Sequence, residues 1–277
     1  MPSDGLVHVT PRVVVTSPEM SIATLGRHMS DCPSMPSEAG PRAVELAAMR
    51  TCMRVCGTQS AAPKCDQGPL TSASRLQGTV AQLKFAQGLP LLRKVLPYVA
   101  DGAPDNETIW LYQLFCLPYR YGSLGLPQAS VSPRDCPLVR SSDQQVKSYG
   151  LSWPKTRVAL VVTDTEHPLT VATMGQMSWF DTTGEEGWKV LYATSPCLGN
   201  TQTVFSIASR LSSLMGYNDL RRRCIKIDLL QELIDAAPLP VRLQVPIQAS
   251  RAGSAMTSTP EVQTSATAWD EILEDLA

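Results

Sequence analysis

Cysteine and histidine residues gather in the amino-terminal quarter of the chain. Cys52 and Cys56 lie four residues apart on an expected helix, so their thiols share one helix face. His28, Cys32 and Cys65 lie nearby in the sequence. Zinc takes four such ligands in a tetrahedron, commonly with two in a tight Cys-x-x-Cys pair, and the sequence contains no such pair. We therefore expect buried cysteines that act as small apolar side chains, and we predict no metal or other cofactor.

A carboxylate beside an imidazole is the second arrangement that could do chemistry. Asp164, Glu166 and His167 follow an apolar stretch that reads as a strand, and loops at strand ends often hold catalytic groups. A carboxylate there could orient the imidazole as a general base. No nucleophile motif accompanies the three residues, so a polar turn is the favoured interpretation. We predict no catalytic residue, and an enzyme that uses this loop stays an alternative.

A basic cluster could bind anions. Arg221, Arg222, Arg223 and Lys226 lie close together in the sequence. Such a cluster would bind the phosphate groups of RNA or of an anionic membrane surface, with an affinity that falls as salt rises. An ordinary solvated face is the competing interpretation, and both stay open.

The last ten residues carry the pattern on which the functional prediction depends. Apolar side chains recur at the spacing of one helix face, and acidic side chains occupy the other face. The apolar stripe is Trp269, Ile272, Leu273 and Leu276, and the acidic residues include Asp270 and Glu271. A helix this short does not hold its conformation alone, so we expect it to fold against a protein partner.

Composition narrows the class of protein. Hydrophobic residues at 43% and charged residues at 18% are typical of a globular chain. The net charge of −1 argues against a protein that coats nucleic acid, although the acidic residues after Arg251 leave the preceding body mildly basic. The amino terminus has no signal-peptide pattern, and no stretch reads as a transmembrane segment. We therefore expect an intracellular protein, cytoplasmic or nuclear, that is not secreted.

The elements that must position these residues suggest an α+β fold. After one strand at 6–16, the first hundred residues read as mainly helical, with helices expected over 41–56, from Leu76 to Gly88, and over 89–99. Residues 108–118 suit either a buried strand or a short helix. Strands are expected at 157–163, 169–180 and 188–194, with a loop at 127–148.

The best-defined pattern lies between 200 and 248. A helix capped by Asn200 and closed by Gly216 precedes a strand at 220–227, a helix capped by Asp228, and a strand at 241–247. We divide the chain into a strand plus helical region (1–100), an α+β body with a small sheet (105–248), a disordered linker (249–267) and a short acidic amphipathic helix (268–277).

These patterns together predict a non-enzymatic interaction or assembly protein, an adaptor or regulator that presents its carboxyl-terminal helix to a protein partner. One alternative is a self-assembling structural protein of the viral matrix type, a homo-oligomer that binds an anionic membrane surface or RNA through the basic cluster.

Overall fold

The computed structural model describes residues 6–10, 13–31, 40–58, 69–83, 88–132, 135, 148–163, 179–183, 187–217 and 225–237. The chain divides into two compact units, Met1–Val245 and Pro246–Ala277, and all described residues belong to the first.

The chain starts with a two-stranded antiparallel hairpin, β1 (Leu6–Thr10) and β2 (Val13–Thr16). The sequence predicted one strand across this region. Two strands form instead, with Pro11 between them, because proline has no N–H to donate to a continuous ladder.

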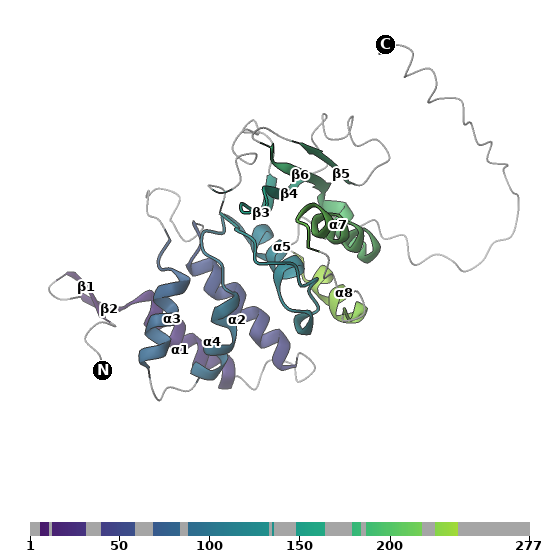
Figure 1. Ribbon diagram of the computed structural model, residues 1–277. Coiled ribbons are helices and arrows are strands. Elements are labelled where there is room, and N and C mark those ends of the chain that lie inside the picture. Colours follow the sequence, from purple (N-terminus) through teal and green to yellow (C-terminus); the bar gives the residue numbers. More distant parts are fainter. Residues whose placement is uncertain are drawn as a thin grey trace, which may run out of the picture. The chain divides into compact units, whose positions relative to one another are not determined.

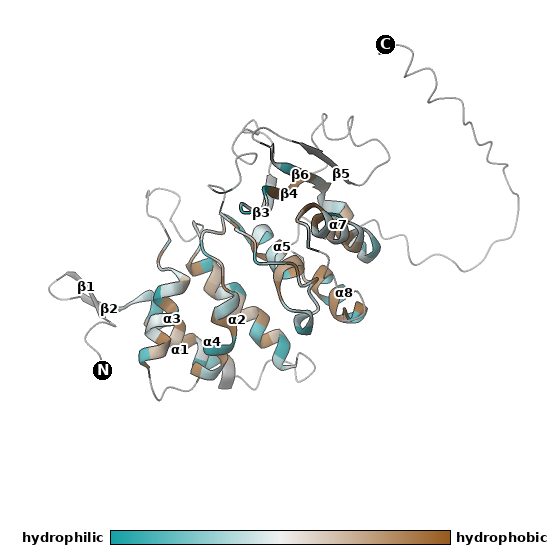
Figure 2. Cartoon of the chain, viewed as in Figure 1, coloured by the Kyte–Doolittle hydropathy of each residue, from teal (hydrophilic) through white to brown (hydrophobic). Residues whose placement is uncertain are grey.

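Four helices follow and pack against one another: α1 (Pro18–Asp31), α2 (Pro41–Val55), α3 (Ala73–Gln82) and α4 (Leu89–Val95) (Figure 1). Hydrophilic and hydrophobic residues alternate around them, as expected for helices with one buried face (Figure 2). Ser17 accepts a hydrogen bond from the Met20 amide at the start of α1, and Ser72 caps α3 in the same way through the Arg75 amide. A short 3-10 turn, η3 (Leu96–Tyr98), extends α4.

Gly88 does not have its predicted role. It was expected to end the helix that begins at Leu76, but α3 ends at Gln82 and Gly88 precedes α4 with φ of 85°. Glycine adopts this left-handed conformation at little cost, so here it turns the chain into the next helix.

Helix α5 (Asn106–Cys116) lies at the centre of the core. Every residue from Glu107 to Cys116 is buried. The Asp105 side chain accepts a hydrogen bond from the Thr108 amide at 2.7 Å and so starts the helix. The sequence was compatible with either a strand or a helix at 108–118, because a helix that is apolar on all sides shows no amphipathic period. A 3-10 turn, η4 (Tyr119–Tyr121), follows α5.

A four-stranded sheet packs beside α5 in the order β3-β4-β6-β5. Its strands are β3 (Ser148–Trp153), β4 (Val158–Thr163), β5 (Trp179–Thr183) and β6 (Lys189–Thr194). The central pair β4–β6 is parallel and the outer pairs are antiparallel. All of β4 is buried, which explains its continuous apolar sequence. The sequence predicted β4 and β6 closely and missed β3, while most of the strand expected at 169–180 lies outside the described residues.

The last described helices are α7 (Thr201–Leu214), which follows the 3-10 turn η8 (Ser195–Gly199), and α8 (Ile227–Asp235). The predicted cap of α7 is confirmed: Asn200 Oδ1 accepts from the amides of Gln202 at 2.8 Å and Thr203 at 3.2 Å. Gly216 closes this helix with φ of 68°.

The predicted cap of α8 is wrong. This helix starts at Ile227, so Lys226 occupies the cap position and Asp228 lies in the first turn. Ile227, expected at the end of a strand, is therefore helical; most of that strand, and the one expected at 241–247, lie outside the described residues.

The main hydrophobic core joins the helices to one face of the sheet. It includes Met49 of α2, Trp110 of α5, Leu160 of β4, Leu211 of α7 and Leu233 of α8. A smaller cluster on the opposite face consists of Ala159, Val161, Trp188 and Val190. The predicted α+β fold is confirmed, with mostly helical content. None of the helices in the described part is long and apolar enough to cross a membrane.

Candidate functional site

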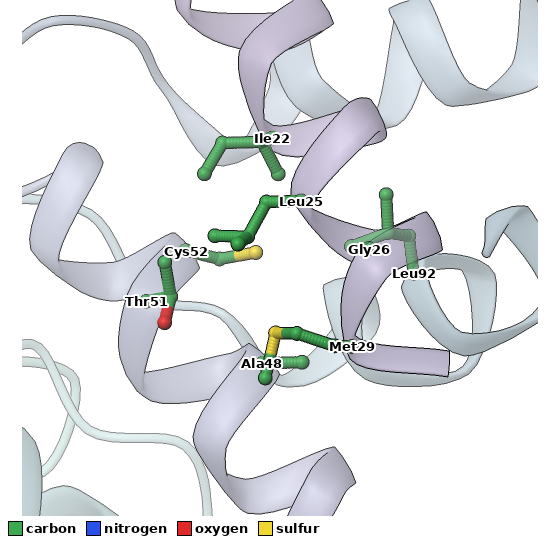
Figure 3. Close-up of a pocket in the computed structure, with 8 residues that line it drawn as sticks. All are labelled: Ile22, Leu25, Gly26, Met29, Ala48, Thr51, Cys52 and Leu92. Atoms are coloured by element: carbon green, nitrogen blue, oxygen red, sulfur yellow. The ribbon is translucent and has the colours of Figure 1, made fainter. Parts of the chain in front are cut away.

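A small apolar groove lies between α1, α2 and α4. It opens to solvent and has about 10 Å³ of free space, roughly the room that one water molecule needs. Figure 3 shows Leu25 of α1 directed toward Cys52 of α2, and Met29 of α1 directed toward Ala48 of α2. The lining residues are Ile22, Leu25, Gly26, Met29, Ala48, Thr51, Cys52 and Leu92. We name this feature the α1–α2–α4 groove.

Two glycines bring α1 and the start of α4 close together and so set the shape of this groove. A Cβ at Gly88 would lie 2.2 Å from the backbone nitrogen of Arg27 and 2.4 Å from the carbonyl carbon of Gly26. A Cβ at Gly26 would lie 3.0 Å from Leu92 Cδ1. Both distances are shorter than ordinary carbon contacts, so the two helices approach this closely only because both positions lack a side chain.

The groove offers an apolar surface without a reactive group. Cys52 is 1% exposed, and burial raises the pKa of its thiol to about 12, so the thiol is protonated at neutral pH. The Thr51 hydroxyl donates to the carbonyl oxygen of Ala47 at 2.9 Å. Leu25 is 38% exposed and remains available for contact. Ligand pockets usually enclose about 300–1,000 Å³, so this groove is too small to hold a small-molecule ligand.

Positive charge predominates among the described exposed side chains of the same three helices. Arg54 donates to Asn106 Oδ1 at 2.8 Å and Arg93 donates to the Leu83 carbonyl at 3.0 Å; both acceptors are neutral. The described acidic side chains of α1, α2 and α4 are Glu19 and Glu45, and both are buried. Among the described side chains, these helices therefore expose Arg54 and Arg93, while Glu19 and Glu45 are buried.

The two buried carboxylates are bound by neighbouring side chains. Glu45 accepts from Lys94 Nζ at 2.5 Å and from the Tyr121 hydroxyl at 2.7 Å. Burial of Tyr121, together with its bond to Glu45, raises the tyrosine pKa to about 12. Arg120 lies over the Tyr121 ring, 4.8 Å from its centroid. This network joins α2, α4 and η4, and its role is structural.

The second carboxylate, Glu19, accepts a hydrogen bond from the Thr71 hydroxyl. Burial opposes ionisation of Glu19, but hydrogen bonds from Thr71, its own backbone and Ser17, together with the charge of Arg75, outweigh burial and lower its pKa. The carboxylate therefore joins the start of α1 to the segment before α3.

The predicted cysteine pair lies in the core. Cys52 and Cys56 are both buried, and burial raises the pKa of the Cys56 thiol well above its ordinary value, with the nearby charge of Asp101 adding to the effect. Neutral thiols among apolar neighbours behave as small hydrophobic side chains. Within the described ranges no group of three or more His, Cys, Asp or Glu side chains could hold a metal ion; Cys32 and Cys65 lie outside those ranges.

Most other predicted site residues lie outside the described residues. This holds for the terminal stripe of Trp269, Ile272, Leu273 and Leu276 with Asp270 and Glu271, for Arg221, Arg222 and Arg223, and for Asp164, Glu166 and His167. Lys226 is described and exposed at the start of α8. Thr163, which directly precedes the Asp164 loop, is the last residue of β4.

The sequence-based prediction included no helix at the position of α1, so it did not indicate the groove. The signals of α1 are nevertheless present: Ser17 as a cap, Pro18 at the first helical position, and Ile22, Leu25 and Met29 at helical spacing. The approach of Gly88 to Gly26 has no counterpart in local sequence, because the two residues belong to different helices.

Comparisons with models of known protein families, with curated proteins and with solved structures found no match to this chain. Any functional conclusion therefore depends on the chain's own residues.

Proposed function

We propose that the protein is a non-enzymatic interaction protein that presents residues 268–277 to a protein partner, in an adaptor or regulatory role. The observation that carries this proposal is the division of the chain into a large compact unit, Met1–Val245, and a separate unit, Pro246–Ala277, whose last residues carry the acidic amphipathic pattern. A short amphipathic segment of this kind suits a groove on another protein.

The chemistry of the segment defines the partner surface. The apolar stripe needs a groove that accepts one aromatic and several aliphatic side chains. The acidic residues Asp270, Glu271, Glu274 and Asp275 favour a groove with basic edges. Residues 249–267, rich in Ser, Thr, Ala and Gln, serve as the linker in this proposal; a flexible chain of this length spans roughly 25 Å.

Affinity capture from cell lysate with the full chain tests the proposal. Trp269→Ala combined with Leu273→Ala removes the centre of the stripe, while Thr257→Ala combined with Thr264→Ala changes two linker residues as a matched control. We expect the bound proteins to be lost with the first pair and kept with the second, with the melting temperature unchanged in both. An identical set of bound proteins for both variants would remove the proposal.

A second candidate function is self-assembly on an anionic surface, either a membrane or RNA. The specific observation in its favour is the outward positive charge of α1, α2 and α4, to which Arg221, Arg222, Arg223 and Lys226 would add. Flotation with vesicles that contain phosphatidylserine, and sedimentation with RNA, test it at increasing salt. Binding that is absent, or that does not change with salt, rejects it.

A further inference from the structure

Arg120 of η4 is exposed, yet its side chain is held in place by two tyrosines. The guanidinium carbon lies 4.8 Å from the centroid of the Tyr121 ring and 5.5 Å from that of the Tyr98 ring, and the two rings meet edge to face. Nη2 donates to the Tyr121 hydroxyl at 3.0 Å and to the Tyr98 hydroxyl at 3.3 Å. Among the described residues, the N–H groups on Nε and Nη1, three of the five that an arginine carries, have no acceptor.

Lys94 and Tyr98 place two further donors beside this arginine. They lie four residues apart in the continuous run of α4 and η3, so their side chains lie on one side of that helix. Lys94 Nζ donates to Glu45 but remains 49% exposed, whereas the Glu45 side chain is only 8% exposed. The Tyr98 hydroxyl accepts from Arg120 and keeps its own proton for donation. Two cations and a hydroxyl thus reach solvent above one buried carboxylate.

We propose that Arg120, Lys94 and Tyr98 form a surface site for the phosphate group of a phosphate monoester. The donors come from three side chains, and a tetrahedral phosphate offers oxygens in as many directions, whereas a carboxylate offers two oxygens in one plane. The charges agree as well, because a phosphate monoester carries about −1.5 to −2 charges at neutral pH and the site exposes two cations.

The fixed position of Arg120 favours binding. Arginine normally loses much side-chain freedom when it binds an anion, but here the stacking on Tyr98 and Tyr121 has already restricted it. The structural role of the surrounding network does not need the outward N–H groups, because Glu45 receives its hydrogen bonds from Lys94 and Tyr121. The site contains no residue of 268–277, so this inference goes beyond the proposed function and is tested separately from it.

Titration of the full-length protein with sodium phosphate near neutral pH tests the site. Proton–nitrogen NMR spectra resolve arginine Nε–H signals, and the signal that is missing from Arg120→Lys identifies Arg120. Sodium chloride at equal ionic strength controls for screening, which does not depend on the kind of anion. Arg210→Lys is the matched control, because Arg210 is an exposed arginine of α7. Circular dichroism checks that each variant is folded.

We expect phosphate, and not chloride, to shift the Arg120 signal with saturation in the millimolar range that is usual for a weak, open site. Backbone amide signals near the site give the dissociation constant of each variant. Arg120→Lys should weaken phosphate binding about fivefold or more, because lysine keeps the charge but loses the planar stacking. Tyr98→Phe removes one hydrogen-bond donor and should weaken binding about two- to tenfold. Arg210→Lys should bind phosphate as the wild type does.

Two results overturn the proposal. One is an Arg120 signal that does not move with phosphate or moves equally with chloride. The other is equal affinity for phosphate in the wild type and Arg120→Lys, since the arginine would then have a structural role alone.

A second titration, with a nucleoside monophosphate, distinguishes the sources of the phosphate group. Tighter binding than that of inorganic phosphate supports a site for a nucleotide whose base adds a contact, and equal binding supports recognition of the phosphate group alone. RNA that contains only phosphodiesters carries one charge per phosphate. If this RNA shifts the Arg120 signal and neither monoester does, the proposal is overturned.

Discussion

Replacing Gly88 with alanine tests the close approach of α1 and α4 that shapes the groove. Gly88 has φ of 85°, and a Cβ there would lie 2.2 Å from Arg27 N and 2.6 Å from Arg27 Cα. Both atoms belong to the backbone of α1, so no side chain can rotate away to make room. The two helices would have to move apart.

The expected loss of stability has two parts. A non-glycine residue in the left-handed region costs about 1–2 kcal/mol, and forcing extra volume into a packed contact costs about 1–3 kcal/mol. Gly88→Ala should therefore lower the free energy of unfolding by about 2–5 kcal/mol. Gly216→Ala is the matched control, because Gly216 has φ of 68° and a Cβ there would meet nothing within 4 Å. Gly216→Ala should lower the free energy of unfolding only by the cost of the left-handed conformation, about 1–2 kcal/mol.

Urea unfolding followed by circular dichroism gives both free energies by linear extrapolation. A second measurement is maleimide labelling of Cys52 in the folded protein, which we expect to accelerate in Gly88→Ala, because the groove that shields this thiol opens as the helices separate. If Gly88→Ala and Gly216→Ala lose the same free energy, α1 and α4 do not approach as closely as the structure has them, and the shape of the groove loses its explanation.

Three further predictions concern stability. Gly78→Ala should raise the urea midpoint and stabilise the protein by about 0.5–1 kcal/mol, because Gly78 is an exposed position inside α3 where a Cβ meets nothing within 4 Å. Tyr121→Phe leaves Glu45 without its donor at 2.7 Å and should cost about 1–3 kcal/mol by urea unfolding, whereas Tyr98→Phe, which alters a longer bond to Arg120, should cost less. Glu19 has a lowered pKa in the folded protein, so its contribution to stability is present above the pKa of the unfolded carboxyl and disappears as pH falls through the folded value. Thr71→Val removes one bond to Glu19 and should shift acid unfolding to higher pH, and an unchanged acid midpoint would contradict this account.

Local patterns in the sequence predicted local structure well. The cap at Asn200, the helix expected from residue 41 and the strand expected at 157–163 each follow from a few adjacent residues, and each is confirmed. The errors occurred where one residue type supports two outcomes. Gly88 could end one helix or precede the next, and the sequence contains nothing that separates these roles, because both use the same positive φ. Asp228 is a good cap residue and equally a good first-turn residue.

The centre of the fold was the hardest part to predict. Helix α5 is buried on all sides, so its sequence shows apolar residues without a period and fits a strand as well as a helix. The structure resolves the ambiguity through contacts that are distant in sequence. Trp110 Nε1 donates to the carbonyl oxygen of Leu233 at 2.8 Å, and the Gln113 amide donates to the carbonyl oxygen of Leu46 at 3.0 Å. Both acceptors belong to other helices.

The groove depends both on local sequence patterns and on contacts between residues that are distant in sequence. Its apolar lining follows from helical spacing within α1 and α2, which the sequence displays, whereas its shape depends on Gly26 and Gly88 meeting across two helices. The terminal segment shows the opposite case: its stripe and its charges are readable residue by residue, but no pattern within it identifies the surface that it binds. A receptor must combine an apolar hollow with basic edges, and both are properties of the partner that the segment's own residues do not locate.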